Sequence, residues 1–224
     1  MAEPVLQVRS ESRTTVGLES EAVVVGGIAA VLGGAAGAIA FAGSAPPIWG
    51  GWSIGLLAAI VVVVLGVTAS YVGYWRARHL TGQEWRLTLP PWKFILDATN
   101  VAAVHALIAG IGTIAGFVLL SLSFRGVTLD GWVAAVSVSA AAGLSAYWIY
   151  LSVSKIDTGK LSMLLVLFIS ITVLTSMATA SDPLWWEYHF SLLGTLGDKS
   201  ASLFNISLII AGLLVTTFSL YLQR

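Results

Sequence analysis

Six long apolar stretches dominate this sequence, and they restrict its fold more than any other feature. A membrane-crossing helix needs roughly 20 mostly apolar residues, because hydrocarbon about 30 Å thick is crossed at about 1.5 Å per residue. The length of the stretches, and their lack of apolar and polar alternation, favour helices over barrel strands. The stretches cover residues 22–42, 54–75, 98–122, 132–153, 161–180 and 201–222, with Pro91 as the earliest start of the third.

Composition agrees with a chain that meets lipid. Of its 224 residues, 57% are hydrophobic and only 10% are charged, whereas a soluble domain carries about 25% charged residues. The 11 basic and 11 acidic residues cancel, and no basic cluster alternates with aromatics, which excludes nucleic acid as a partner. The absence of cysteine excludes disulfides and thiolate chemistry. We therefore predict an all-α integral membrane bundle of six transmembrane helices.

Basic residues give the orientation. The predicted organisation is an N-terminal tail over residues 1–21, a six-span membrane domain over 22–222 and a C-terminal end at 223–224. One side of the membrane receives nine Lys and Arg residues, and the other receives only Arg125 and Lys199. Because Lys and Arg accumulate in cytoplasmic loops, both termini are expected in the cytoplasm. The Gly-, Ala- and Val-rich spans favour the plasma membrane of a prokaryote.

The first apolar stretch has one alternative interpretation, a secretory signal cleaved after Ala40-Phe41-Ala42. However, the tail holds four glutamates beside Arg9 and Arg13, whereas the corresponding region of a signal is positive, and the apolar run exceeds a typical signal core. A retained span is the preferred interpretation.

Small residues recur at helical spacing in several spans. Such stripes let helix backbones approach closely in lipid. They fit either packing within the bundle or a surface for a partner subunit or a second copy of the chain. The stripes are Gly26, Ala30, Gly34 and Ala38 with Gly33 and Gly37 beside them, Gly112 and Gly116, and Ala135, Ser139 and Gly143.

The last outer loop, residues 181–200, carries local signals of a short interfacial helix. Asp182 suits an N-cap, Pro183 the first helical position and Gly194 the residue past the end. Its aromatic and leucine residues favour a position on the membrane surface. We therefore expect one short helix over residues 182–194.

The same loop holds the candidates for catalysis. A histidine with carboxylates can act as acid and base or bind zinc, but no H-x-x-x-H or H-E-x-x-H spacing is present, and the metal question stays open. Capping explains the two aspartates, and Glu187 and His189 lie on different sides of a regular helix. No phosphate-binding or nucleophile motif occurs, and no cofactor is expected. The candidates are Asp182, Glu187, His189 and Asp198.

A second polar group begins the third span. Asp97, Asn100 and His105 share a broad helical face, and ionisable groups inside a membrane suggest function by default. Lys93, one turn before Asp97, offers an ion-pair partner. The alternatives are an ion pair with an interhelical hydrogen bond from His105, or a proton or ligand path. Asn205, early in the sixth span, fits a polar interhelical contact.

The C-terminal block resembles a widespread prokaryotic family of multi-spanning proteins, catalogued as domain of unknown function 998. The likeness covers roughly the last 60 residues and otherwise only the number of spans. It implies a membrane fold without a settled activity. It is carried by an aromatic outer loop with Ser191, Leu193 and Gly194, followed by Phe204, Asn205 and Gly212.

The preferred function is non-enzymatic: binding of lipid or a partner membrane subunit through the outer aromatic loop and the small-residue faces. One alternative is a membrane-embedded hydrolase or transferase acting on lipid-linked substrates at the outer leaflet. The other is a small secondary transporter built around Asp97, Asn100 and His105.

Overall fold

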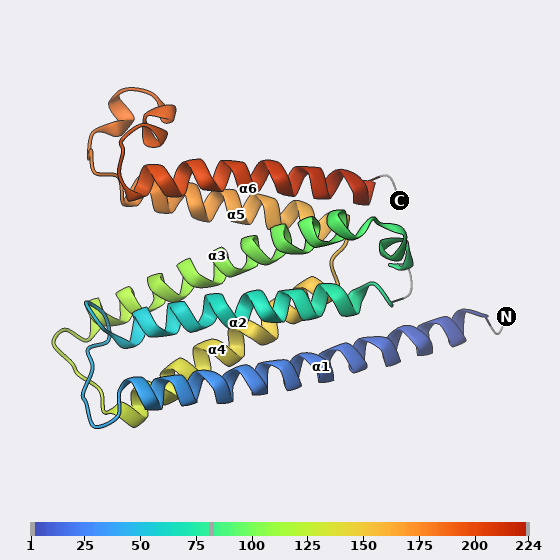
Figure 1. The fold of residues 1–224 in the computed structure, drawn as a ribbon, viewed down its shortest axis with the longest axis horizontal. Coiled ribbons are helices and arrows are strands. Elements are labelled where there is room, and N and C mark those ends of the chain that lie inside the picture. Colours follow the sequence, from blue (N-terminus) through green and yellow to red (C-terminus); the bar gives the residue numbers. More distant parts are fainter. Residues whose placement is uncertain (1–2, 81–82, 223–224) are drawn as a thin grey trace. The chain divides into compact units, whose positions relative to one another are not determined.

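The computed structural model describes residues 3–80 and 83–222, with the backbone alone for residues 3–16 and for Leu220. The predicted C-terminal end at 223–224 lies outside these residues. Within the described ranges every regular element is a helix, which confirms the all-α class (Figure 1). The elements are α1 Glu3–Ala40, α2 Ile54–Ala77, η1 Glu84–Thr88, α3 Pro91–Ser123, α4 Gly131–Ser154, α5 Thr158–Ala178, η2 Trp185–Glu187, η3 Phe190–Gly194 and α6 Lys199–Leu222.

The six α-helices are all long and apolar enough to cross a membrane, as predicted. The third begins at Pro91, the earliest start proposed. The apolar part of α1 begins at Gly17, but its backbone is helical from Glu3, so the predicted tail at 1–21 is helical from that residue. Hydropathy marks where a helix turns apolar, and a helix can continue through polar residues beyond that point.

The chain forms two compact units, and each is described by itself. The first comprises residues 1–89 and 109–155, and the second comprises residues 90–108 and 156–224. The single membrane domain expected over residues 22–222 stays a prediction.

In the first unit, α1 and α4 pack closely through their small residues (Figure 1). A Cβ atom added to Gly33 would lie 2.7 Å from Ala142 Cβ, and one added to Gly37 would lie 2.7 Å from Ala135 Cα. Ser139 Oγ donates a hydrogen bond of 2.8 Å to the Ala30 carbonyl. The stripes on α1 and α4 are therefore used for packing within the chain.

A polar cluster joins three helices of the same unit. Glu21 on α1 accepts a 2.7 Å hydrogen bond from the Arg76 guanidinium on α2. Tyr150 on α4 donates its hydroxyl to the same carboxylate at 2.6 Å. Lys155 lies 3.5 Å from Glu19 nearby. These contacts fix α1, α2 and α4 to one another near one end.

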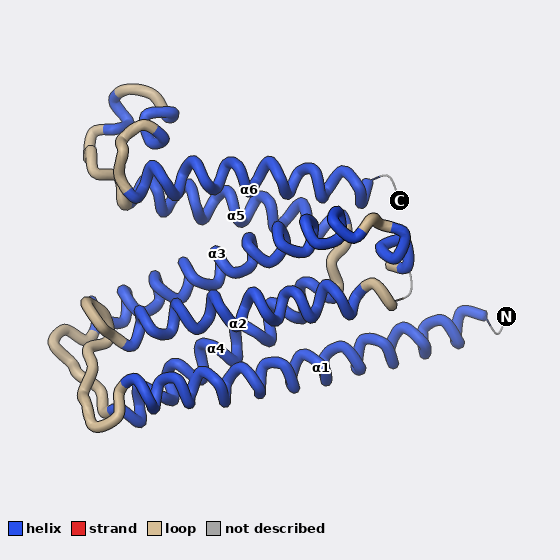
Figure 2. Tube along the Cα trace, in the orientation of Figure 1, coloured by secondary structure: helices blue, strands red, loops and turns tan. Residues whose placement is uncertain are grey.

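At the other end of this unit, two loops come together (Figure 2). The Leu129 N–H donates to the Pro46 carbonyl at 3.2 Å, and Pro47 and Thr128 form an isolated antiparallel bridge. Phe41 is buried beneath them, beside Ile54 and Ala134. The loops before α2 and before α4 therefore meet as one layer.

In the second unit, α5 and α6 lie side by side (Figure 1). Asp157 caps α5 by accepting a 2.9 Å hydrogen bond from the Lys160 N–H. Buried Thr172 and Ser176 donate their hydroxyls to carbonyls one turn back in the same helix, at 2.8 and 2.9 Å. Polar atoms in this apolar helix are thereby satisfied locally.

The loop between α5 and α6 has short helical turns where one helix was expected over residues 182–194. The turns are η2 and η3, and they are separated because His189 has an extended backbone with φ −146° and ψ 151°. Both turns close through hydrogen bonds over three residues, such as Glu187 N–H to the Leu184 carbonyl at 3.0 Å. Such 3₁₀ turns are rarely longer than a few residues, so the loop is divided.

Candidate functional site

The polar group at the start of α3 meets a residue of α6. Asp97 Oδ1 accepts a 3.2 Å hydrogen bond from Lys93 Nζ, the predicted ion pair. It also accepts a 2.9 Å hydrogen bond from the Thr217 hydroxyl. Asn100 Nδ2 donates to Thr217 Oγ1 at 3.4 Å. Asp97, Asn100 and Thr217 are all buried, and we call these three residues the α3–α6 cluster.

His105 shares the helix but not these contacts. Its ring Nδ1 lies 2.8 Å from the Val101 carbonyl of the same helix, and because a carbonyl only accepts, that nitrogen carries the proton. His105 is fully buried and lies about 12 Å from Asp97 along the helix axis, given a rise of about 1.5 Å per residue. The structure thus separates His105 from the two residues with which it was grouped.

Both loop aspartates accept hydrogen bonds from nearby backbone N–H groups. Asp182 Oδ1 accepts a hydrogen bond from the Leu184 N–H at 2.9 Å. Asp198 Oδ1 accepts from the Ala201 N–H and from Ser200 Oγ, both at 2.7 Å, at the start of α6. Its Oδ2 accepts from the Ser181 N–H at 2.9 Å. The capping role expected for Asp198 is therefore present, whereas Asp182 binds only the N–H two residues further on and does not cap η2, whose N-cap is Leu184.

These donors act on the ionisation of Asp198. Hydrogen bonds from the side chains of Ser181 and Ser200 and from the Ala201 N–H hold the pKa of the carboxyl well below its usual value. Each donor stabilises the charged form. The carboxylate is thus suited to a cap and unsuited to carrying a proton near neutral pH.

Glu187 and His189 are both exposed. Glu187 ends η2 and His189 precedes η3, so a break in the helical backbone lies between them. Among the residues that the structure describes, no three His, Asp or Glu side chains gather closely enough to hold a metal ion. The hydrolase or transferase alternative needs Glu187 and His189 to converge with an aspartate, and both aspartates accept hydrogen bonds from backbone N–H groups of the loop and of α6.

The second half of the loop is docked on α6. Asn205 Nδ2 donates to the Gly194 carbonyl at 2.8 Å, so the interhelical contact expected for Asn205 is instead a contact between helix and loop. A Cβ atom on Gly194 would lie 2.7 Å from Asn205 Oδ1. The Phe190 and Phe204 rings pack edge to face with their centroids 5.4 Å apart. Leu193 is fully buried. The loop is therefore a supported structure.

Several large side chains of the same loop face outward. They are apolar or amphipathic, and they span both η2 and the break after it. Their exposed fractions are 46% for Leu184, 62% for Trp186, 70% for Tyr188 and 53% for Phe190. Trp and Tyr combine an apolar ring with a polar atom and prefer the level of the lipid headgroups.

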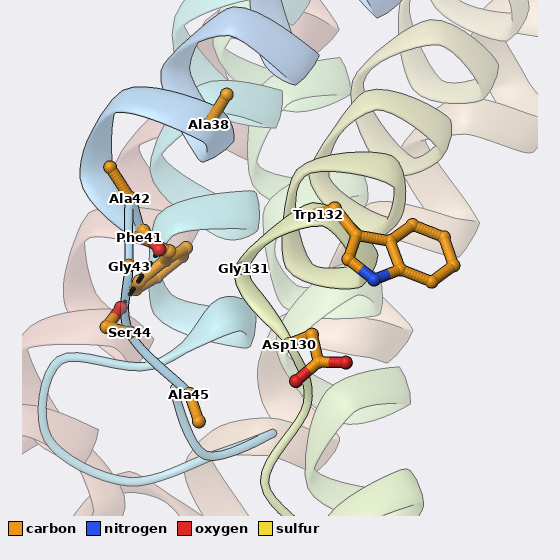
Figure 3. Close-up of a pocket in the computed structure, with 9 residues that line it drawn as sticks. All are labelled: Ala38, Phe41, Ala42, Gly43, Ser44, Ala45, Asp130, Gly131 and Trp132. Carbon is orange, nitrogen blue, oxygen red and sulfur yellow. Dashed lines mark hydrogen bonds between the residues drawn. The ribbon is translucent and has the colours of Figure 1, made fainter.

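A surface hollow of about 510 Å³ lies in the first unit, where α1 ends and α4 begins (Figure 3). Its floor includes Phe41, whose carbonyl accepts a 3.0 Å hydrogen bond from Ser44 Oγ. Asp130 is the sole ionisable residue of its lining. The hollow thus offers a single carboxylate next to the exposed Trp132, and no acid–base pair.

Two residues of interest were not singled out by the sequence. Thr217 is an ordinary residue in an apolar span, and only its contact across 120 positions to Asp97 makes it notable. Arg86, which was counted among the loop charges, is 1% exposed and places its guanidinium 4.6 Å from the centre of the Tyr74 ring. The aromatic residue Trp85 beside it in the sequence is a weak signal for such a contact.

These features define an all-helical protein with six helices able to span a membrane. No family model, no curated protein and no solved structure matches this chain. The resemblance to the family of domain of unknown function 998 therefore stays a prediction.

Proposed function

We propose that this protein is a non-enzymatic component of a membrane that contacts lipid through the loop between α5 and α6. The supporting observation is the row of exposed large side chains at Leu184, Trp186, Tyr188 and Phe190. In water, such a row would leave a large apolar surface exposed, whereas at a membrane surface the rings lie among headgroups and acyl chains.

The support beneath this row favours binding over a mobile tether. Asn205 and Phe204 of α6 hold Gly194 and Phe190 of the loop. Asp198 links the beginning and the end of the loop because it accepts from Ser181 while capping α6. Side chains presented from such a base lose less conformational freedom on contact with a ligand.

A partner subunit is the less favoured occupant. The small-residue face of α1, expected to serve either packing or a partner, lies against α4, and Gly33 and Gly37 leave no space for a further helix there. Gly112 and Gly116 on α3 have no neighbour within 4 Å of an added Cβ atom. Aromatic side chains are concentrated on the loop, and the loop is therefore our choice of contact surface.

The proposal includes a location and an orientation. We infer that the membrane is the plasma membrane of a prokaryote, that both termini are cytoplasmic and that the loop faces outward. The support is the excess of Lys and Arg, nine against two, on the predicted cytoplasmic side. Membership of the family of domain of unknown function 998 is part of the same proposal.

Spin labelling tests the lipid contact directly. The chain has no cysteine, so single cysteines in place of Trp186 and Tyr188 can be labelled specifically in protein reconstituted into bilayers. We expect both labels to relax more with dissolved oxygen, which enters the bilayer, than with a polar nickel complex, which stays in water. Labels at the headgroup level should give intermediate values of the ratio.

Two positions of the same unit serve as references. A label at Thr195, exposed at the end of η3, should behave as aqueous. A label at Ile209, 65% exposed within α6, should behave as deep in the hydrocarbon. Labels at Trp186 and Tyr188 that match Thr195 would show that the loop stands in water, and the proposal would be abandoned.

A further inference from the structure

Two buried oxygens of the α3–α6 cluster lack a hydrogen-bond donor. Asp97 Oδ2 and Asn100 Oδ1 accept no hydrogen bond from any residue in the described ranges. Asp97 is 1% exposed and Asn100 is 4% exposed. A buried acceptor without a donor is destabilising, and both atoms belong to a helix able to span a membrane. These two unsatisfied oxygens therefore indicate a binding site for a proton or a cation.

The two oxygens belong to one site. Asp97 and Asn100 are three residues apart on α3, which places them on neighbouring turns of one face. The Thr217 hydroxyl contacts both residues, because it donates to Asp97 Oδ1 and accepts from Asn100 Nδ2. A single residue of α6 thus draws the carboxylate and the amide together.

The chemistry of the two groups favours a proton over a metal cation. An ionised carboxylate only accepts hydrogen bonds, whereas a protonated one also donates. A proton on Asp97 Oδ2 provides the kind of donor that Asn100 Oδ1, one turn further along the same helix, lacks. Sodium sites in membrane proteins draw on carbonyls of unwound helices, but α3 and α6 are continuous helices at these positions.

The charges around the site leave Lys93 as the direct counter-charge. Other titratable residues on the helices of the second unit are His105 on α3, Lys160 on α5 and, near the cluster, Tyr221 on α6. Lys160 pairs with Asp157 at 3.7 Å. Lys199 and Asp198 lie at the opposite end of α6, about 27 Å away at a rise of about 1.5 Å per residue. The Lys93 side chain is 17% exposed, so its ammonium has a route to water.

We propose that Asp97 is a proton-binding site, in which one proton on Oδ2 is shared with Asn100 Oδ1. The proton comes from a hydronium ion, which leaves as water, and the carboxylate becomes a carboxylic acid with no change of oxidation state. Lys93 then loses its charged partner and turns toward water, so proton uptake is coupled to the position of a cation. This inference goes beyond lipid contact and needs none of the loop residues.

Infrared difference spectroscopy of the reconstituted protein tests the site. Spectra recorded across a titration from pH about 9 to about 6, above the range in which exposed aspartates protonate, should show a carboxylic acid C=O band that shifts when aspartate is labelled with ¹³C at the carboxyl carbon. Asp97→Asn should abolish this band. Asn100→Ala should move it to higher frequency, because the acid then loses its hydrogen-bond acceptor.

Two further variants keep the test decisive. Asp97→Glu retains a carboxyl group, and its band should no longer respond to the aspartate label. Glu187→Gln, an acid-to-amide change on the exposed loop, should leave the band unchanged. If Asp97→Asn does not fold, the labelled wild-type protein and Asp97→Glu decide the question alone.

Three results would overturn the proposal. They are the absence of an aspartate-sensitive band across the titration, a band that persists in Asp97→Asn, and a carboxylate that stays ionised while sodium, but not choline, raises the unfolding temperature. The last result would assign the site to sodium.

Discussion

Asp198 concentrates more donors on one carboxylate than any other loop residue described. Hydrogen bonds from Ser181, Ser200 and Ala201 lower its pKa. The folded-state pKa lies below the unfolded value of about 3.9, so the carboxylate stabilises the fold above that pH, and the contribution is lost as the pH falls below it. The beginning of α6 is therefore sensitive to acid.

We expect Asp198→Ala to lower the unfolding temperature at pH 7, because the cap and the link to Ser181 are lost. The difference from the wild type should shrink as the pH falls below about 3.9, because the unfolded-state carboxylate protonates there, and it should vanish once the pH also falls below the lowered pKa of the folded-state carboxylate. Asp198→Asn, which keeps an acceptor oxygen, should lie between the two at pH 7. Tryptophan fluorescence during heating measures all three, and a difference independent of pH would contradict the assignment.

Residue contacts could be predicted from sequence where both partners are local. The Lys93–Asp97 pair and the cap at Asp198 follow from spacings of three to four residues, whereas the cap expected at Asp182 did not form because no helix begins there. Thr217 in the α3–α6 cluster did not follow, because its partner Asp97 lies 120 positions away. Periodicity assigns a residue to a helical face, but it does not say which helix that face meets.

Among the helices, the α1–α4 pair shows the clearest match between sequence and packing. Gly37 is buried where an added Cβ atom would lie 2.7 Å from the Ala135 Cα atom. Backbone atoms cannot yield as a flexible side chain can. Gly112 of α3 has the same spacing motif, but nothing lies within 4 Å of its added Cβ atom.

These two glycines predict opposite outcomes for the same substitution. Gly37→Ala should reduce the free energy of unfolding by about 1–2 kcal/mol, because overpacking outweighs the better helix propensity of alanine. Gly112→Ala should be neutral or stabilising by up to about 1 kcal/mol. Unfolding temperatures in one detergent compare the two variants, and equal shifts of the same sign would refute the close packing of α1 on α4.

The number and type of the helices were predictable because six apolar runs are a strong signal. Their ends were less so, as α1 shows by continuing to Glu3 in a polar segment. The loop between α5 and α6 carried start and stop signals for one helix, yet His189 is extended and divides it. Docking of Gly194 and Phe190 on α6 competes there with local helix signals.

The whole molecule combines six helices able to span a membrane with a one-sided distribution of basic residues. Six helices are long and apolar enough to cross a membrane, and an even number returns the C-terminus to the side of the N-terminus. Every loop is then assigned to one side, so the pattern of accessible loops tests spans and orientation together. Because the chain has no cysteine, only the introduced residue can be labelled in such a test.

Single cysteines placed in or directly beside the five loops and labelled in intact cells with a membrane-impermeant maleimide provide that measurement. We expect labelling at Ser44, Val127 and Thr195, and no labelling at Glu84 and Lys160 until the cells are permeabilised. All five positions are exposed in the structure. Labelling of Glu84 together with Thr195 in intact cells, or the reversed pattern, would contradict the six-span topology or its orientation.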